Sequence, residues 1–527
     1  MTDTKKPGTN HQTAAKSSRT SFISCWFCHQ QTDRRLCIWC GSDTEAAPVE
    51  RGKFIARDPF VRLQERFSPR LASISQSVRL PFIRLNLWEQ VVVLSSVAKW
   101  TLLASIVGVL AGSASAAFLG SLGLATAFRI AHPWLLFLLP VCGLAVGFAY
   151  HKWGRSVESG NNLILEHIHE PAGGGVPLLM APFILIATVL SHLFGASAGR
   201  EGTALQMGGS LAAWISRTLQ LRPEDTRLML MAGMSAGFGA VFGVPLAGAI
   251  FGMEVQAVGR IRYNGILPCL VGSVVGDLVC RAWGIQHGNY AIAQTGGITV
   301  PLILKLAVAG IIFGITALIF SEFTHAVKDV FGRLFRWPPL RPAIGGLVII
   351  SMTYAVGNNE YLGLSLPLLS TAAGGGKVVL YAFALKLLFT AVTLGSGFKG
   401  GEVTPLFVIG ATLGYSLSYL MGGPTALFAT AGFIAVFAAA ANTPIACFIM
   451  GVELFGGAYA LPYGIVCIMA YLFSGHRGIY LAQRVESPKS KSLFVNARFT
   501  LREVREANSV TRPSRDINER AESENVG

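Results

Sequence analysis

The chain has 527 residues, of which 52% are hydrophobic and only 13% are charged, and its mean hydropathy is +0.51. A soluble domain carries about twice that charged fraction, so the composition excludes an ordinary soluble fold and predicts a membrane protein. The formal net charge of +15 is concentrated in the two polar ends of the chain. Basic flanks are typical of the cytoplasmic side of a membrane protein, so we expect lipid headgroups, and not nucleic acid, as their acidic neighbours.

Residues 1–85 form a polar, basic, turn-rich region that lacks the apolar core of a signal peptide. Four of its cysteines follow the spacing C-x2-C-x8-C-x2-C, namely Cys25, Cys28, Cys37 and Cys40. Four thiolates suit a tetrahedral structural zinc site, although the linker of eight residues is shorter than the usual ribbon spacing. We expect zinc here, with a reactive or incidental cysteine cluster as the alternative. The remaining cysteines lie singly in apolar segments and are expected to be packing residues.

Long apolar runs between about Leu87 and Leu472 predict a transmembrane domain over residues 86–485. A full helical crossing of a bilayer takes about 20 residues, and most of these runs are long enough to span or half-span it. Several runs are broken by glycine, proline or an ionisable residue, so helices of unequal length are expected, some of them crossing incompletely. The predicted fold class is an all-α polytopic membrane protein, followed by a basic polar tail over residues 486–527.

The apolar region contains an internal repeat, with halves over about 90–285 and 300–485. Three pairs of landmarks share one spacing of 199 residues: Gly233 and Gly432, Pro245 and Pro444, and Glu254 and Glu453. Agreement of several features in one register indicates duplication. The register alone does not separate a parallel from an inverted repeat; we expect an inverted repeat of broken and tilted helices, as in many transporters. Because Glu254 and Glu453 match each other, we expect a structural role for both.

Each half also contains a carboxylate among glycines, in Gly199-Arg200-Glu201-Gly202-Thr203 and in Gly400-Gly401-Glu402-Val403-Thr404-Pro405. A carboxylate at bilayer depth is expensive, which favours a functional role. Glycines let backbone amides approach an anion, and a helix that begins just after them directs its positive end toward it. An ionised Glu201 would compete with the anion and, once protonated, would leave the site, so it would act as a gate and a proton carrier. The alternative is a structural ion pair between Arg200 and Glu201.

Over residues 90–485 these motifs resemble those of the CLC family of chloride channels and anion/proton antiporters. The first carboxylate motif resembles the family's gating-glutamate motif, the second resembles its second-half filter motif, and Gly243-Val244-Pro245-Leu246-Ala247-Gly248 resembles a helix entry of the family. Tyr480 falls at the position of the family's central tyrosine. The resemblance implies a transporter rather than an enzyme. It further implies a homodimer with one pore per subunit, in the plasma (inner) membrane, with both termini cytoplasmic.

Several positions depart from the chloride-type pattern. Asn161, in Gly160-Asn161-Asn162, falls where chloride-type members have a serine, Thr203 where most members have a proline, and Val403 where they have a phenylalanine. Together with Glu402 and Thr404, these departures are similar to the fluoride/proton antiporter branch. That branch also lacks an internal proton-transfer glutamate, and the matching residue here is Val255. The implied anion-binding residues are Asn161, Asn162, Gly199, Gly202, Thr203, Val403, Thr404 and Tyr480, with Glu201 and Glu402 as the proton-carrying pair.

The physical chemistry of fluoride is consistent with these departures. Fluoride is small and strongly hydrated, so it needs strong donors in close contact. An asparagine amide offers two N–H donors, whereas a serine hydroxyl offers one. Glu402 would add a second protonatable group on the inner half of the path, with Thr404 or Tyr480 as its candidate partner. The alternative for Asn161 and Asn162 is helix capping.

The sequence therefore predicts a secondary transporter that exports fluoride in exchange for protons. A chloride channel or chloride/proton antiporter of the same family is the first alternative. The second is a membrane-anchored zinc sensor that has lost transport, against which the intact Glu201 argues. No cofactor is expected for transport itself.

Overall fold

The computed structural model describes residues 23–24, 31–32, 87–170, 175–288, 297–490 and 499–509. The chain divides into two compact units, residues 1–63 and 64–527. In the first unit the described residues are two short antiparallel strands, β1 (Ile23–Ser24) and β2 (Gln31–Thr32). The four cysteines of the predicted zinc site lie outside the described residues, so that site stays a prediction.

The second unit is helical, which confirms the predicted all-α membrane fold. Its first half holds α3 (Leu87–Ala131), α4 (Leu139–Lys152), α5 (Asn161–His169), α6 (Met180–Leu193), α7 (Glu201–Thr218), α8 (Pro223–Phe242), α9 (Pro245–Glu254) and α10 (Ile266–Ala282). The second half holds α11 (Val300–Leu334), α12 (Leu340–Val356), α13 (Leu366–Ala373), α14 (Ala382–Gly395), α15 (Val403–Met421), α16 (Thr425–Ala441), α17 (Pro444–Phe455) and α18 (Ala460–Phe473). Five helical segments of the described part are long and apolar enough to cross a membrane, by length and composition. Several apolar helices are shorter, as the broken runs predict.

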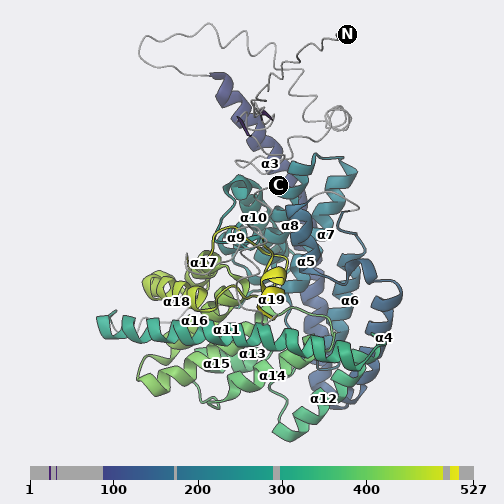
Figure 1. Ribbon diagram of the computed structural model, residues 1–527, viewed down its shortest axis with the longest axis vertical. Coiled ribbons are helices and arrows are strands. Elements are labelled where there is room, and N and C mark those ends of the chain that lie inside the picture. Colours follow the sequence, from purple (N-terminus) through teal and green to yellow (C-terminus); the bar gives the residue numbers. More distant parts are fainter. Residues whose placement is uncertain are drawn as a thin grey trace, which may run out of the picture. The chain divides into compact units, whose positions relative to one another are not determined.

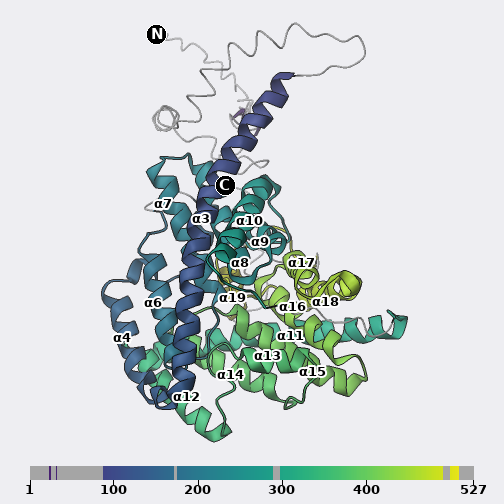
Figure 2. The same cartoon turned by 180° about the vertical axis from the view of Figure 1, so that it is seen from behind.

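The internal repeat is visible in how the helices pack. Helix α3 lies along α6, α7, α8 and α10 of its own half, and α11 lies along α14, α15, α16 and α18 of the other. Figure 1 shows α11 crossing the green helices, and Figure 2 shows α3 running along the blue and teal ones. Each long helix therefore packs against the corresponding partners in its half.

Helices α9 and α17 join the halves through two carboxylates. The carboxylate of Glu254, at the end of α9, accepts hydrogen bonds from the backbone N–H groups of Ile445 (3.1 Å) and Ala446 (2.8 Å) at the start of α17. The carboxylate of Glu453 accepts the equivalent bonds from the first turn of α9, at 3.0 and 2.7 Å. Each glutamate thus satisfies amides that a helix start leaves unpaired. The reciprocal, antiparallel contact gives both residues the expected structural role and is what an inverted repeat predicts.

The two glycine-rich loops meet between the halves. Gly199 and Gly401 form an antiparallel bridge in which each N–H donates to the other's carbonyl, at 2.6 and 2.8 Å. A Cβ atom on Gly401 would lie 2.8 Å from the backbone nitrogen of Gly202, and one on Gly199 would lie 2.8 Å from Pro405. Only glycine fits at such close backbone approaches. The bridge places the starts of α7 and α15 beside each other.

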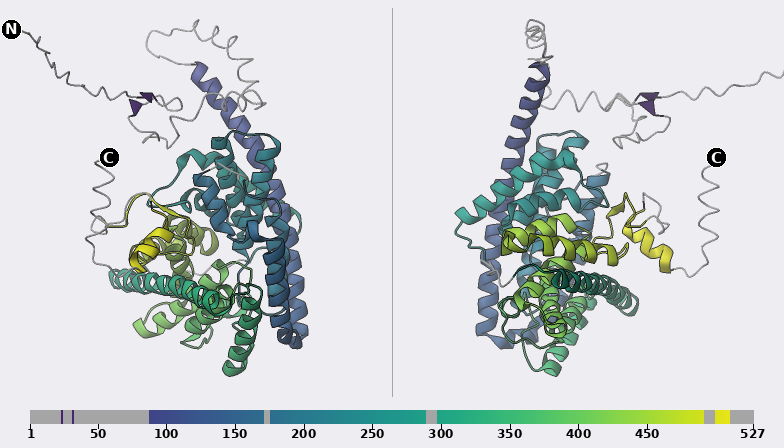
Figure 3. Two further views of the ribbon diagram at one scale, coloured as in Figure 1. Left: turned by 45° about the vertical axis from the view of Figure 1, so that its right-hand side comes forward. Right: turned by 90° about the vertical axis from the view of Figure 1, so that its left-hand side faces the viewer.

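Part of the predicted polar tail, together with the residues just before it, is folded within the second unit. Strand β4 (Arg484–Val485) pairs in parallel with β3 (Ala257–Val258), and Arg484 also bridges to Thr500. Helix α19 (Leu501–Ser509) then begins with a capping box, because Thr500 N–H donates to Glu503 and Glu503 N–H donates to the Thr500 hydroxyl. Figure 3 shows this yellow helix beside the second half. Backbone bonds from α19 to the carbonyls of residues 481 and 483 hold the segment that carries Tyr480.

Candidate functional site

The first turn of α15 binds the carboxylate of Glu201. Glu201 is fully buried and accepts hydrogen bonds from the backbone N–H of Thr404 at 2.9 Å and from its hydroxyl at 2.5 Å. A helix start with a free amide and a hydroxyl is an arrangement that binds anions, so the carboxylate occupies the place of an anion here. The Arg200 guanidinium is also present, 3.3 Å away. The alternative of a simple Arg200–Glu201 pair is therefore incomplete, since the shorter contacts reach into the other half.

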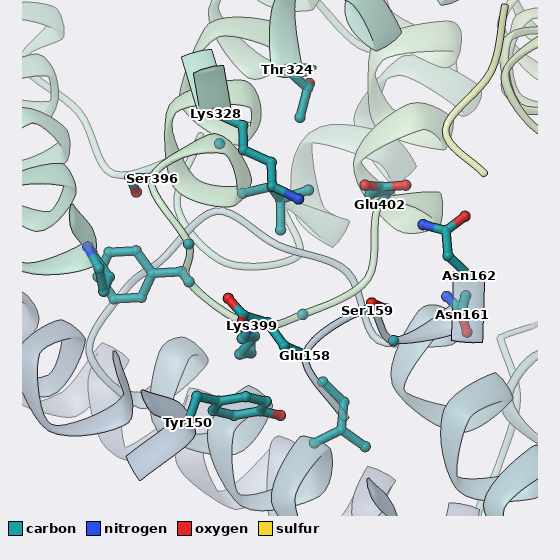
Figure 4. Close-up of a pocket in the computed structure, with 18 of the residues that line it drawn as sticks. Tyr150, Glu158, Ser159, Asn161, Asn162, Thr324, Lys328, Ser396, Lys399 and Glu402 are labelled. Carbon is teal, nitrogen blue, oxygen red and sulfur yellow. The ribbon is translucent and has the colours of Figure 1, made fainter. Parts of the chain in front are cut away.

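Glu402 is the residue immediately before α15, and its carboxylate is in a different situation. It forms no hydrogen bond or ion pair with any residue that the structure describes, and it lines a cavity of about 540 Å³. The sequence suggested Thr404 or Tyr480 as its partner, but the Thr404 hydroxyl is bonded to Glu201. The Glu201 carboxylate is thus held at the helix start. The Glu402 carboxylate faces the cavity instead, as Figure 4 shows.

The cavity carries an excess of positive charge. Its lining contains two carboxylates, those of Glu158 and Glu402, and five cationic side chains, those of Arg155, Lys328, Arg341, Lys399 and Arg502. The ammonium group of Lys399 lies 4.4 Å from the centre of the Tyr150 ring. A cleft lined by one sign of charge raises the local concentration of ions of the other sign. The cavity is therefore suited to collecting anions beside Glu402.

Asn161 and Asn162 have separate roles. The side chain of Asn161 makes no hydrogen bond within the described residues, and its carbonyl oxygen is buried. A Cβ atom on Gly202 would lie 3.3 Å from the Asn161 amide nitrogen, so this free amide lies against the gate motif. The Asn162 carbonyl accepts from the backbone N–H of Ala482 at 2.9 Å and so holds the Tyr480 segment. Neither side chain caps α5, whose N-cap is Gly160.

Of the other predicted anion-binding residues, some line the cavity and others are buried and do not line it. Tyr480 is buried and lines the cavity with Asn161 and Glu402. The hydroxyl of Thr203 is 2.7 Å from that of Thr188 on α6, so these two hydroxyls are hydrogen-bonded to each other. Val403 is fully buried at the start of α15. The structure therefore brings Asn161, Glu402 and Tyr480 together at one cavity.

Sequence reasoning missed the cationic lining. Lys399 lies three residues before Glu402, so the sequence motif itself could have predicted that the two side chains lie close together. Lys328 lies on α11, and only the fold brings it to the same cavity (Figure 4). Val255, which the family resemblance matches to the chloride-type proton-transfer glutamate, is fully buried and apolar. Within the described ranges, no group of three or more His, Cys, Asp or Glu residues is placed to hold a metal ion.

Comparison with known proteins gives consistent matches. The family model described as voltage gated chloride channel matches residues 142–475. The chain is 50% identical to a chloride/fluoride channel protein of Pseudomonas syringae pv. tomato, over 76% of this chain and 90% of that protein. It is 29% identical to the H(+)/Cl(-) exchange transporter ClcA of Cronobacter sakazakii, over 72% and 88% of the two chains. Among solved structures, a CLC-type fluoride/proton antiporter matches with a TM-score of 0.71 and 34% identity, over 74% of this chain and 98% of that one.

Proposed function

Because the chain belongs to the voltage gated chloride channel (CLC) family, we propose that it is an integral membrane transporter that exports fluoride in exchange for protons. The names of its relatives support transport of fluoride or chloride, and the fluoride/proton antiporter structure supports proton coupling. We further propose a homodimer in the plasma (inner) membrane with both termini cytoplasmic, from the family resemblance and the basic ends.

The observation that supports coupling best is the placement of the Glu201 carboxylate at the start of α15. The same Thr404 N–H and O–H groups that it occupies would suit a fluoride ion. An ionised Glu201 therefore excludes the anion, and a protonated Glu201 loses its charge-assisted bonds and leaves the site. Because the anion can bind these Thr404 donors only after Glu201 has taken up a proton, movement of one ion is tied to movement of the other. Glu402 would exchange protons between Glu201 and the cavity.

One experiment separates the candidate functions. The purified protein is reconstituted into liposomes loaded with fluoride or chloride, and anion efflux and external pH are recorded together. A fluoride/proton antiporter moves protons against their gradient when a fluoride gradient is applied. A chloride/proton antiporter does so with chloride, a channel passes the anion without driving protons uphill, and a sensor transports neither ion.

Asn161 is expected to set the preference for fluoride. The Asn161→Ser variant removes an amide donor beside the gate motif, so we expect the fluoride-to-chloride flux ratio to fall by about tenfold, the equivalent of one hydrogen bond. The measurement is the ratio of initial efflux rates in matched liposomes. The control is Asn162→Ser, which breaks the tie to Ala482 and should slow both anions alike. An unchanged ratio in Asn161→Ser would move selectivity to Val403 or Tyr480.

The N-terminal cysteines are expected to bind one zinc ion without taking part in transport. Four thiolates close a tetrahedral site and leave no open position for chemistry. Deleting residues 1–60 should abolish zinc, measured by elemental analysis of purified protein, and should preserve exchange in liposomes. Replacing Cys25 and Cys28 with serine is the narrower version of this test. Absence of zinc from the purified full-length protein would contradict the predicted zinc site.

A further inference from the structure

Lys386 is a fully buried lysine on α14 that the proposed transport cycle does not use. Its amine donates to the Ser197 hydroxyl at 2.9 Å and the Gly363 carbonyl at 2.8 Å. It also contacts the Ser365 hydroxyl at 2.9 Å and the Tyr361 carbonyl at 3.2 Å. None of these contacts is a carboxylate. Burying the polar end of a lysine costs free energy unless hydrogen bonds satisfy it. A polar group kept inside an apolar membrane domain favours a specific role for Lys386.

The contacts of Lys386 join two loops. Ser197 lies in the loop between α6 and α7, residues 194–200, which we call the gate loop. Residues 361–365 form the loop before α13. The loops also meet directly, because the Gly363 N–H donates to the Ala196 carbonyl at 3.2 Å. Ser365 has a φ of +56°, a conformation that a residue other than glycine keeps only when its surroundings hold it. The side-chain nitrogen of Lys386 thus donates to acceptors on both loops at once.

The same face of α14 holds the gate loop at two further points. The Thr390 and Ser197 hydroxyls are 3.1 Å apart, and the Ser197 N–H donates to the Thr393 hydroxyl at 3.2 Å. Residues 386, 390 and 393 follow the spacing of one helical face. On the other side, the Nε2 atom of His192 lies 3.0 Å from the Ala198 carbonyl oxygen. The chain is thus fixed up to Gly199, which bridges to Gly401.

We propose that Lys386 is a positioning residue for the gate loop, holding Gly199 in register with Gly401 so that the Glu201 carboxylate returns to the start of α15 in every cycle. Its hydrogen-bond partners include none of the predicted anion-binding residues. The inference rests on the proposed function in one respect, namely that Glu201 is the proton-coupled gate. Loss of the amine would free the loop, and the anion would then pass without waiting for the proton.

The test compares Lys386→Met with Lys305→Met. Lys305, on α11, donates to the Gly422 carbonyl at 2.7 Å and so also holds a loop, but not the gate loop. For Lys386→Met we expect hydrogen exchange of the amides of residues 197–201 to accelerate at least tenfold, relative to amides elsewhere. We also expect the number of protons moved per anion to fall by half or more while anion flux continues. Lys386→Arg should recover much of the coupling, and Lys305→Met should change neither quantity.

Unchanged exchange and coupling in Lys386→Met would overturn the proposal, as would faster exchange throughout the protein with coupling intact. If Lys386→Met does not fold, the double variant Ser197→Ala, Thr390→Val is used instead. It removes the Ser197 and Thr390 hydroxyls, through which α14 holds the gate loop, and leaves the lysine in place. That variant must then show the local acceleration and the loss of coupling for the proposal to stand. The exchange measurement needs no ion, and coupling is measured with fluoride and with chloride. A wrong anion assignment is therefore distinguished from a wrong role for Lys386.

Discussion

Replacing Glu201 with glutamine is expected to abolish proton movement driven by an anion gradient. The glutamine keeps the shape of the side chain and can still accept from Thr404, but it carries no titratable proton. Without the charge its bonds at the start of α15 weaken, so the anion displaces it more easily. We expect proton transport to fall on the order of 100-fold or more, toward that of empty liposomes, while fluoride continues to leak down its gradient.

Simultaneous recording of pH and fluoride in liposomes checks this prediction. Glu201→Ala should behave alike, since it also leaves the site open. A suitable control is Glu360→Gln, because the Glu360 side chain is exposed in the loop after α12. If Glu201→Gln still drove protons uphill on an anion gradient, the gate assignment would be wrong.

The sequence predicted the parts of the site that lie within motifs. Glu201 and Glu402 stand out because a carboxylate among glycines in an apolar run is rare, and no fold is needed to notice it. The 199-residue spacing predicted that Glu254 and Glu453 are equivalent. It did not predict that each binds the first turn of the other's helix, because spacing within a chain says nothing about contacts between its halves.

The contacts between the two halves could not be predicted from the sequence for the same reason. Thr404, two residues after Glu402, was expected as a candidate partner of Glu402. The Thr404 N–H and hydroxyl instead donate to Glu201, at the start of α7 in the other half. Lys386 was visible as an isolated lysine in an apolar run, but its partners come from two other loops. Helix α19 in the tail could have been predicted from the sequence, because Thr500 and Glu503 have the spacing of a capping box.

Glu402 offers the sharper test of the fluoride assignment, because the structure separates a proton-carrying role from a structural one. Its carboxylate has no hydrogen bond or ion pair among the described residues, in contrast to Glu254, which accepts two backbone bonds. Glu402→Gln therefore removes no hydrogen bond or ion pair among the described residues, and the free energy of unfolding should change by no more than about 0.5 kcal/mol. If Glu402 exchanges protons between the cavity and Glu201, proton-coupled fluoride export should fall on the order of 100-fold.

The two glutamate variants should also fail differently. Glu201→Gln leaves a passive path for the anion. Glu402→Gln retains Glu201 but removes its supply of protons from the cavity, so both the fluoride flux and the proton flux should fall. Fluoride and proton fluxes in liposomes, with thermal unfolding and oligomeric state measured on the same samples, distinguish these outcomes. Joint loss of stability and turnover in Glu402→Gln would mark Glu402 as structural. Full coupled turnover would reject both roles and favour the generic chloride-type function, because the carboxylate that replaces an apolar residue of the chloride-type motif would then have no part in transport.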